Sequence, residues 1–146
     1  MAEPEPAAEL PKGERLQVTV LFADLSNFTA LSERLDMEET HALLNRYFET
    51  VDSLVGSYGG SIDKHIGDGV MAVFGAPVAH SEDPARAVRA AFDIQAAVGA
   101  LEAPGGGALG CHIGLANGQV VASGTGSAAH REYTITGDSV NLASRL

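Results

Sequence analysis

The sequence has one cysteine, no tryptophan and few aromatic residues, and these shortages exclude several classes of protein. Because the lone cysteine, Cys111, cannot close an intramolecular disulfide, a disulfide-stabilised secreted fold is excluded. No apolar run approaches the roughly 20 residues that cross a bilayer. The first residues also lack the basic and apolar regions of a signal peptide. We therefore expect a protein of the reducing cytoplasm.

Positive charge is scarce as well. Nine lysines and arginines stand against 19 aspartates and glutamates, which gives a net charge of -10. Such a surface repels a phosphate backbone, so nucleic acid is not an expected partner. An anionic small ligand would need local cations or metal ions to bind. The length of 146 residues and the hydrophobic content of 45% fit one mixed α/β domain.

Residues 1–15 contain three prolines and no apolar period. This composition is typical of a flexible Pro/Glu-rich linker and is compatible with flanking regulatory domains. We expect the folded domain to occupy residues 16–146. Because the last residues still follow a helical pattern, we expect that domain to be incomplete at its C-terminus.

Apolar periodicity and turn residues predict alternating strands and helices. Gly67-Asp68-Gly69 and Asn117-Gly118 each indicate a tight hairpin turn. Asp83-Pro84 indicates the start of a helix, with Asp83 as N-cap. The expected elements in order are a strand at 16–22 that ends at Asp24, a helix whose apolar residues run from Leu43 to Tyr58, a hairpin of 61–66 and 70–74, a helix from Asp83 that is broken at 104–107, a hairpin of 111–116 and 119–122, a strand at 132–136 and a helix at 139–145.

This order predicts an α+β fold, a ferredoxin-like βαββαβ sandwich with helices packed on a mainly antiparallel sheet. The inward face of the helix after Asp83 is expected to carry Ala87, Val88, Ala91, Ile94, Ala97 and Val98.

Two aspartates stand where the backbone turns and exposes them. Asp24 ends an apolar strand, and Asp68 lies between two glycines at a hairpin tip. Paired carboxylates at strand ends can hold Mg²⁺ ions on a phosphate chain, because Mg²⁺ prefers oxygen ligands and shares its coordination with substrate oxygens. Taken singly, each residue is as well explained as an ordinary turn or N-cap aspartate.

Three other groups carry weaker signals, each with a plainer explanation. The segment from Ser26 to Thr29 enters a helix, so its N–H groups could bind phosphate or merely be capped. Lys64 could contact a ligand or pair with its neighbour Asp63. Asn141 and Arg145 share one face of the last predicted helix and could reach one ligand, although polar helix faces are common.

Four stretches together closely resemble the class III adenylyl and guanylyl cyclases, and within them the Thr-type, bacterial-like adenylyl cyclases. The resemblance runs from about Leu16 to the last residue and rests on residues 21–29, 63–75, 113–122 and 132–145. Their order and length make it specific, unlike any single piece.

The resemblance implies a role for each candidate residue. Asp24 and Asp68 would bind two Mg²⁺ or Mn²⁺ ions. The other implied roles are substrate binding by Phe28 and Thr29, base recognition by Lys64 and Thr134, and transition-state stabilisation by Asn141 and Arg145. It also implies an antiparallel homodimer in which one chain holds the metals and its partner supplies Lys64, Thr134, Asn141 and Arg145.

ATP is the expected substrate. The Lys64 ammonium can donate to adenine N1 and the Thr134 hydroxyl can accept from the N6 amine, whereas guanine N1–H calls for a carboxylate. The expected activity is therefore that of an adenylate cyclase. The alternatives are a cyclase that uses GTP, a catalytically silent nucleotide-binding or dimerisation module of the same fold, and a generic interaction domain.

Two departures from the family pattern carry expectations of their own. Many members have aspartate where this chain has Thr134, and the hydroxyl, which both donates and accepts, favours looser base discrimination. In having Thr134 the chain resembles the subgroup that includes bicarbonate-responsive cyclases, so activation by bicarbonate is a further hypothesis. The family's domain continues past Arg145 to a lysine that holds the triphosphate, so we expect little activity from these 146 residues alone.

Overall fold

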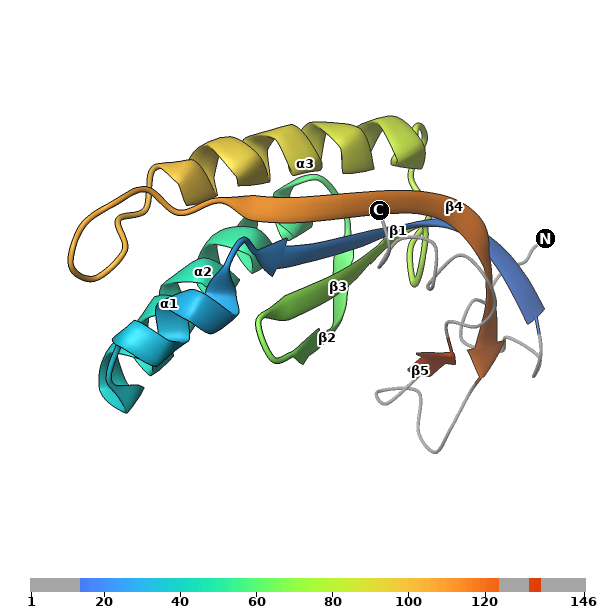
Figure 1. Cartoon of the computed structure of the whole chain (residues 1–146). Helices are drawn as coiled ribbons and strands as arrows, with labels where there is room; N and C mark the ends of the chain where they lie inside the picture. Colours follow the sequence, from blue (N-terminus) through green and yellow to red (C-terminus); the bar gives the residue numbers. More distant parts are fainter. Residues whose placement is uncertain (1–13, 124–131, 135–146) are drawn as a thin grey trace.

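A computed structural model describes residues 14–123 and 132–134, and Figure 1 shows its arrangement. The mixed α+β architecture predicted from the sequence is confirmed. Strands and helices follow in the order β1 (Glu14–Leu25), α1 (Phe28–Arg34), α2 (Met37–Ser57), β2 (Ser61–Ile66), β3 (Gly69–Phe74), α3 (Asp83–Gly99), β4 (Cys111–Ser123) and β5 (Glu132–Thr134).

The strands form one sheet in the order β2-β3-β1-β4-β5, and every neighbouring pair is antiparallel. The first four strands and the helices between them make the βαββαβ unit that the sequence predicts. Strand β1 lies in the middle of the sheet, paired with β3 on one side and with β4 along all of its length on the other.

The alternation of β1 divides the sheet into two faces. Leu21, Ala23 and Leu25 join the main core with buried residues of all three helices. Val18 and Val20 point the other way, into a smaller cluster with Met71 and Val73 of β3. We call this side, on which Phe22 also lies, the second face of the sheet.

Helix α2 begins at Met37, six residues before the first apolar position used to predict it. Its N-terminus is fixed by a capping box, in which the Asp36 side chain accepts from the Glu39 N–H and the Glu39 side chain accepts from the Asp36 N–H. The buried stripe consists of Leu43, Tyr47, Val51 and Val55.

The second predicted hairpin is wrong. Residues 111–123 form the single strand β4, in which Asn117 and Gly118 pair with Thr19 and Val18 of β1. The Thr19 hydroxyl donates to Asn117 Oδ1 at 2.6 Å. Because β1 is twelve residues long, it provides a backbone hydrogen-bonding partner to every residue across the expected turn. The chain therefore continues as one strand and does not reverse at Asn117-Gly118.

Helix α3 differs from its prediction at both ends. Its N-cap is Glu82, and Asp83 is the first helical residue, whose carboxylate accepts from the His80 N–H at 2.8 Å. The helix ends at Gly99, before the predicted break at 104–107. Val88 was expected inside, but it is 42% exposed. The buried residues of α3 include Ala87, Ala90, Ile94 and Val98, and Val88 is rotated about 100° around the helix axis from Ala87.

Strand β1 begins at Glu14, two residues before the predicted strand. Strand β5 occupies the first part of the strand predicted at 132–136. The remainder of that strand and the helix predicted at 139–145, with Asn141 and Arg145, lie outside the described residues. Within the described part, none of the helices has the length and apolar character needed to span a bilayer.

Candidate active site

The turn between β2 and β3 places Asp68 at the end of the central strand. Ile66 pairs with Gly69, so Gly67 and Asp68 alone make the turn, and Gly67 has a φ of +60°. Glycine with positive φ at the first position is the pattern of a type II′ hairpin turn. From this position Asp68 Oδ2 accepts a hydrogen bond from the Leu25 N–H at 2.9 Å. The hairpin tip thus reaches the residue next to Asp24.

Asp24 follows the alternation of β1 onto the second face, where it lies opposite His112 of β4. Partial burial and the negative charge of Asp68 raise the pKa of the Asp24 carboxyl, and the nearby His112 lowers it. The two carboxylates are therefore close enough to repel each other. A bound cation would relieve that repulsion.

An open pocket of about 570 Å³ adjoins both carboxylates. Its wall is formed by the end of β1, the first two turns of α1 and the hairpin tip. The lining residues are Asp24, Leu25, Asn27, Phe28, Thr29, Ala30, Glu33 and Asp68. The first N–H groups of an α-helix have no acceptor within the helix, so the start of α1 adds hydrogen-bond donors to a wall that carries three acidic side chains.

The structure brings four of the predicted site residues together, namely Asp24, Asp68, Phe28 and Thr29. Glu33 and His112 were not singled out from the sequence. Glu33 lies one helical turn after Thr29, so helical spacing could have found it. The proximity of His112 to Asp24 depends on the register of β4 with β1, which no local pattern reveals.

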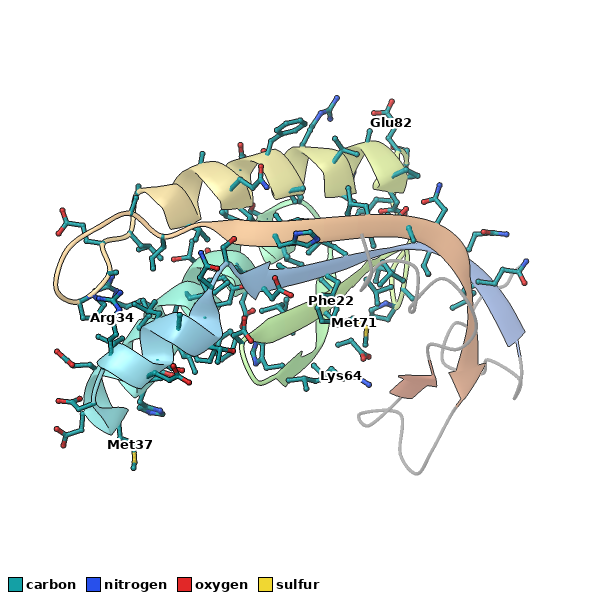
Figure 2. The ribbon with its side chains drawn as sticks, in the orientation of Figure 1. Phe22, Arg34, Met37, Lys64, Met71 and Glu82 are labelled. Carbon is teal, nitrogen blue, oxygen red and sulfur yellow. The ribbon has the colours of Figure 1, made fainter. Side chains whose placement is uncertain are left out.

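Lys64 lies away from this pocket. Its strand position pairs with Met71, which in turn is next to Phe22, and Figure 2 shows the three side chains near one another on β2, β3 and β1. The ammonium is 3.5 Å from Asp63 Oδ2 and half exposed. The pairing with Asp63 weighed in the sequence is thus present, and Lys64 stands on the second face of the sheet.

The remaining predicted residues are less fully placed. Thr134 belongs to β5 and pairs with Val121, which sets its backbone position only. Asn141 and Arg145 fall outside the described ranges.

The donor set fits Mg²⁺ or Mn²⁺. Among residues 14–123 and 132–134, no group of three or more histidine, cysteine, aspartate or glutamate side chains is arranged as a complete metal cage. Mg²⁺ does not need one, because it is usually held by one or two carboxylates together with waters and substrate phosphates. The mutual repulsion of Asp24 and Asp68 beside an open pocket matches that mode of binding.

Comparisons with known proteins agree on a family. The sequence model of the family described as the adenylate and guanylate cyclase catalytic domain matches residues 10–146. Adenylate cyclase 1 of Rhizobium meliloti is 34% identical over 136 residues, which cover 90% of this chain and 20% of that protein. The chain thus spans about a fifth of this curated relative.

Solved structures give the same result. The guanylyl cyclase Cya2 superposes with a TM-score of 0.81 and 35% identity, over 92% of this chain and 71% of that one. The catalytic core of a rhodopsin-guanylyl cyclase with converted specificity, in complex with ATPalphaS, superposes with a TM-score of 0.80 and 32% identity. This match covers 93% of this chain and 74% of that one. The chain belongs to the family of adenylate and guanylate cyclase catalytic domains.

Proposed function

We propose that this domain converts ATP to 3′,5′-cyclic AMP and pyrophosphate. The observation that carries the proposal is the hydrogen bond from the Leu25 N–H to Asp68, which sets the Asp68 carboxylate beside Asp24 at the mouth of the pocket. Two neighbouring carboxylates with helix N–H groups beside them suit a triphosphate that arrives with divalent cations.

Asp24 and Asp68 would hold two Mg²⁺ or Mn²⁺ ions. Such ions lower the pKa of the ribose 3′-hydroxyl and neutralise the triphosphate. The 3′-oxygen then forms a bond to the α-phosphorus, its proton passes to water, and the bond to the pyrophosphate oxygen breaks. Phe28 and Thr29, at the first turn of α1, would contact the substrate through the pocket wall.

Lys64 and Thr134 would recognise the base, and Asn141 and Arg145 would stabilise the transition state. The Arg145 guanidinium can meet charge that develops on the α-phosphoryl oxygens, an interaction that accelerates the reaction because it strengthens in the transition state. The position of Lys64 outside the pocket supports an antiparallel homodimer, since its ammonium could then serve the pocket of the partner chain.

A cyclase that uses GTP is the second candidate. It is favoured by the likeness to the guanylyl cyclase Cya2, which is as close as the likeness to the Rhizobium adenylate cyclase. The base-recognition chemistry of Lys64 and Thr134 favours ATP, because neither side chain offers a carboxylate to guanine N1–H.

Competition between the two nucleotides tests the proposal. The full-length protein is incubated with equal ATP and GTP in Mn²⁺ or Mg²⁺, and the cyclic products are separated and quantified. Cyclic AMP should dominate and should fall by at least about 100-fold in Asp68→Ala, because the metal-binding carboxylate is lost. Glu49→Ala, which removes an exposed acidic side chain of α2, is the matched control. Dominant cyclic GMP would favour the second candidate, and nucleotide binding without either product would favour a silent module.

A further inference from the structure

The strand that carries Lys64 has an irregular register. Among the described strands β2 pairs only with β3, so it forms an edge of the sheet. Ile62 pairs with Ala72, but the next pair is Lys64 with Met71, which leaves Asp63 as an extra residue in a β-bulge. Edge strands with such irregularities are prone to slip, and a slip by one residue exchanges the two faces of the strand.

The competing register can be written down. Continuing the Ile62–Ala72 pairing without a bulge would set Lys64 opposite Val70 and His65 opposite Gly69. Ile66, Gly67 and Asp68 would then form a three-residue hairpin loop, which is also a common length. In this register Lys64 would turn toward α2 and leave the second face, and Asp63 would stand opposite Met71 in its place.

In the observed register three side chains of β2 and α2 contact one another. His65 pairs with Val70 and so faces α2. There its ring stacks on Phe48, with centroids 4.3 Å apart and planes inclined by 20°. Its Nε2 lies 3.0 and 3.1 Å from the two carboxylate oxygens of Asp52.

Phe48 and Asp52 are one turn apart on α2, so both meet the same imidazole. No other residue type in β2 could satisfy both contacts at once, since serine, isoleucine, aspartate and lysine lack an aromatic N–H. A slipped strand would lose the stack and the hydrogen bond together.

We propose that Phe48, Asp52 and His65 form a register lock that keeps Lys64 on the second face of the sheet. His65 and Asp52 are thus positioning residues that act through Lys64 and do not touch the nucleotide. The inference rests on the proposed role of Lys64 in base recognition, but its structural part stands apart from the reaction.

The structural part is tested by NMR on the full chain. Wild-type protein should show cross-strand NOEs between Lys64 and Met71, which His65→Ala should weaken or replace with NOEs between Lys64 and Val70. His80→Ala is the matched control, because His80 also faces an aspartate, Asp83, at 3.8 Å but lies before α3, outside β2. Unchanged Lys64–Met71 NOEs in His65→Ala would overturn the proposal.

The functional part is tested by a double-mutant cycle in the full-length protein. His65→Ala should raise KM for ATP by roughly tenfold and narrow the preference for ATP over GTP, because Lys64 is displaced from the base. Asp52→Asn should act in the same direction, and His65→Gln, which keeps a donor for Asp52, should restore part of the loss.

In Lys64→Ala the further change His65→Ala should cost little more, because the lock then has no lysine to place. Fully additive effects would contradict action through Lys64. Absence of any cyclic nucleotide from the wild-type protein would refute the proposed function instead, and the NOEs would still decide whether the lock exists.

Discussion

At the scale of the residue, the Asp24 carboxylate lowers the stability of the fold but has a proposed role in metal binding. Burial and the charge of Asp68 raise its pKa, so the folded protein binds the Asp24 proton more tightly than the unfolded chain does. Stability then falls as pH rises through the folded-state pKa. The ionised Asp24 carboxylate, which we propose to bind metal, therefore lowers the stability of the metal-free fold.

We predict that Asp24→Asn is more stable than the wild type at pH 7 and inactive. The gain should shrink as pH is lowered below the Asp24 pKa, where the wild-type carboxyl is already neutral. Urea denaturation at pH 7 and at a series of lower pH values measures this gain in the free energy of unfolding. Asp63→Asn, on the surface, should show no such gain, and a loss of stability in Asp24→Asn at neutral pH would contradict the argument.

The buried hydroxyl of Tyr47 also lowers the stability of the fold. Its side chain is fully buried, and its hydroxyl has no hydrogen-bond partner among the described residues. We predict that Tyr47→Phe leaves stability unchanged or raises it by about 1 kcal/mol, because an unpaired buried hydroxyl carries a desolvation penalty. Thermal unfolding measures the change.

Tyr58→Phe is the matched control, since the Tyr58 hydroxyl donates to Asp93 and its loss should be neutral or destabilising. A larger loss of stability in Tyr47→Phe than in Tyr58→Phe would show that the Tyr47 hydroxyl makes a stabilising hydrogen bond.

At the scale of the element, the helix starts differ in how they are capped. Asp36 begins α2 with a reciprocal capping box, whereas Glu82 begins α3 with a left-handed φ of 63° and no side-chain cap. Figure 2 labels Glu82 at the start of α3. Asp36→Ala should therefore cost about 1 kcal/mol. Glu82→Ala should change stability by less than half of that. Chemical denaturation of the two variants compares them, and equal losses would show that the box contributes little.

The two hairpin signals in the sequence show what a local pattern can and cannot predict. Gly67-Asp68 forms the expected turn because the strands on either side pair with each other. Asn117-Gly118 carries as strong a signal, yet it lies within β4 because β1, about 100 residues earlier, supplies a continuous partner. Local turn preference of this kind is outweighed by a long ladder of backbone hydrogen bonds.

The candidate site divides in the same way. Asp24 and Asp68 could be predicted because each occupies a turn or strand end that its neighbours in sequence define. Glu33 was within reach only through its helical spacing from Thr29, and His112 was out of reach because its place beside Asp24 depends on the register of β4 with β1. Long-range geometry therefore supplies the part of the site that motifs leave out.

At the scale of the whole molecule, the separation of Lys64 from the acidic pocket predicts that variants complement each other. Asp68→Ala and Lys64→Ala should each have little activity alone. If the proposed antiparallel homodimer forms and the mixed variants exchange subunits, half of the dimers should contain one chain of each variant, with one intact site of two. Roughly a quarter of wild-type activity should return.

Steady-state assays of the mixture against each variant measure this recovery. Mixing Asp68→Ala with Asp24→Ala is the control, because both changes damage the same half-site and no intact site can form. Recovery in the control, or none in the test mixture, would show that Lys64 and Asp68 serve one site within a single chain.

The central place of β1 has a consequence for how the pocket can be observed. Segments held by backbone hydrogen bonds on both sides open rarely, and their amide protons exchange slowly with deuterium. The Leu25 amide closes that strand and has the Asp68 carboxylate as its acceptor. Deuterium uptake at the Leu25 amide, measured without substrate, would thus report how often its hydrogen bond to the Asp68 carboxylate breaks.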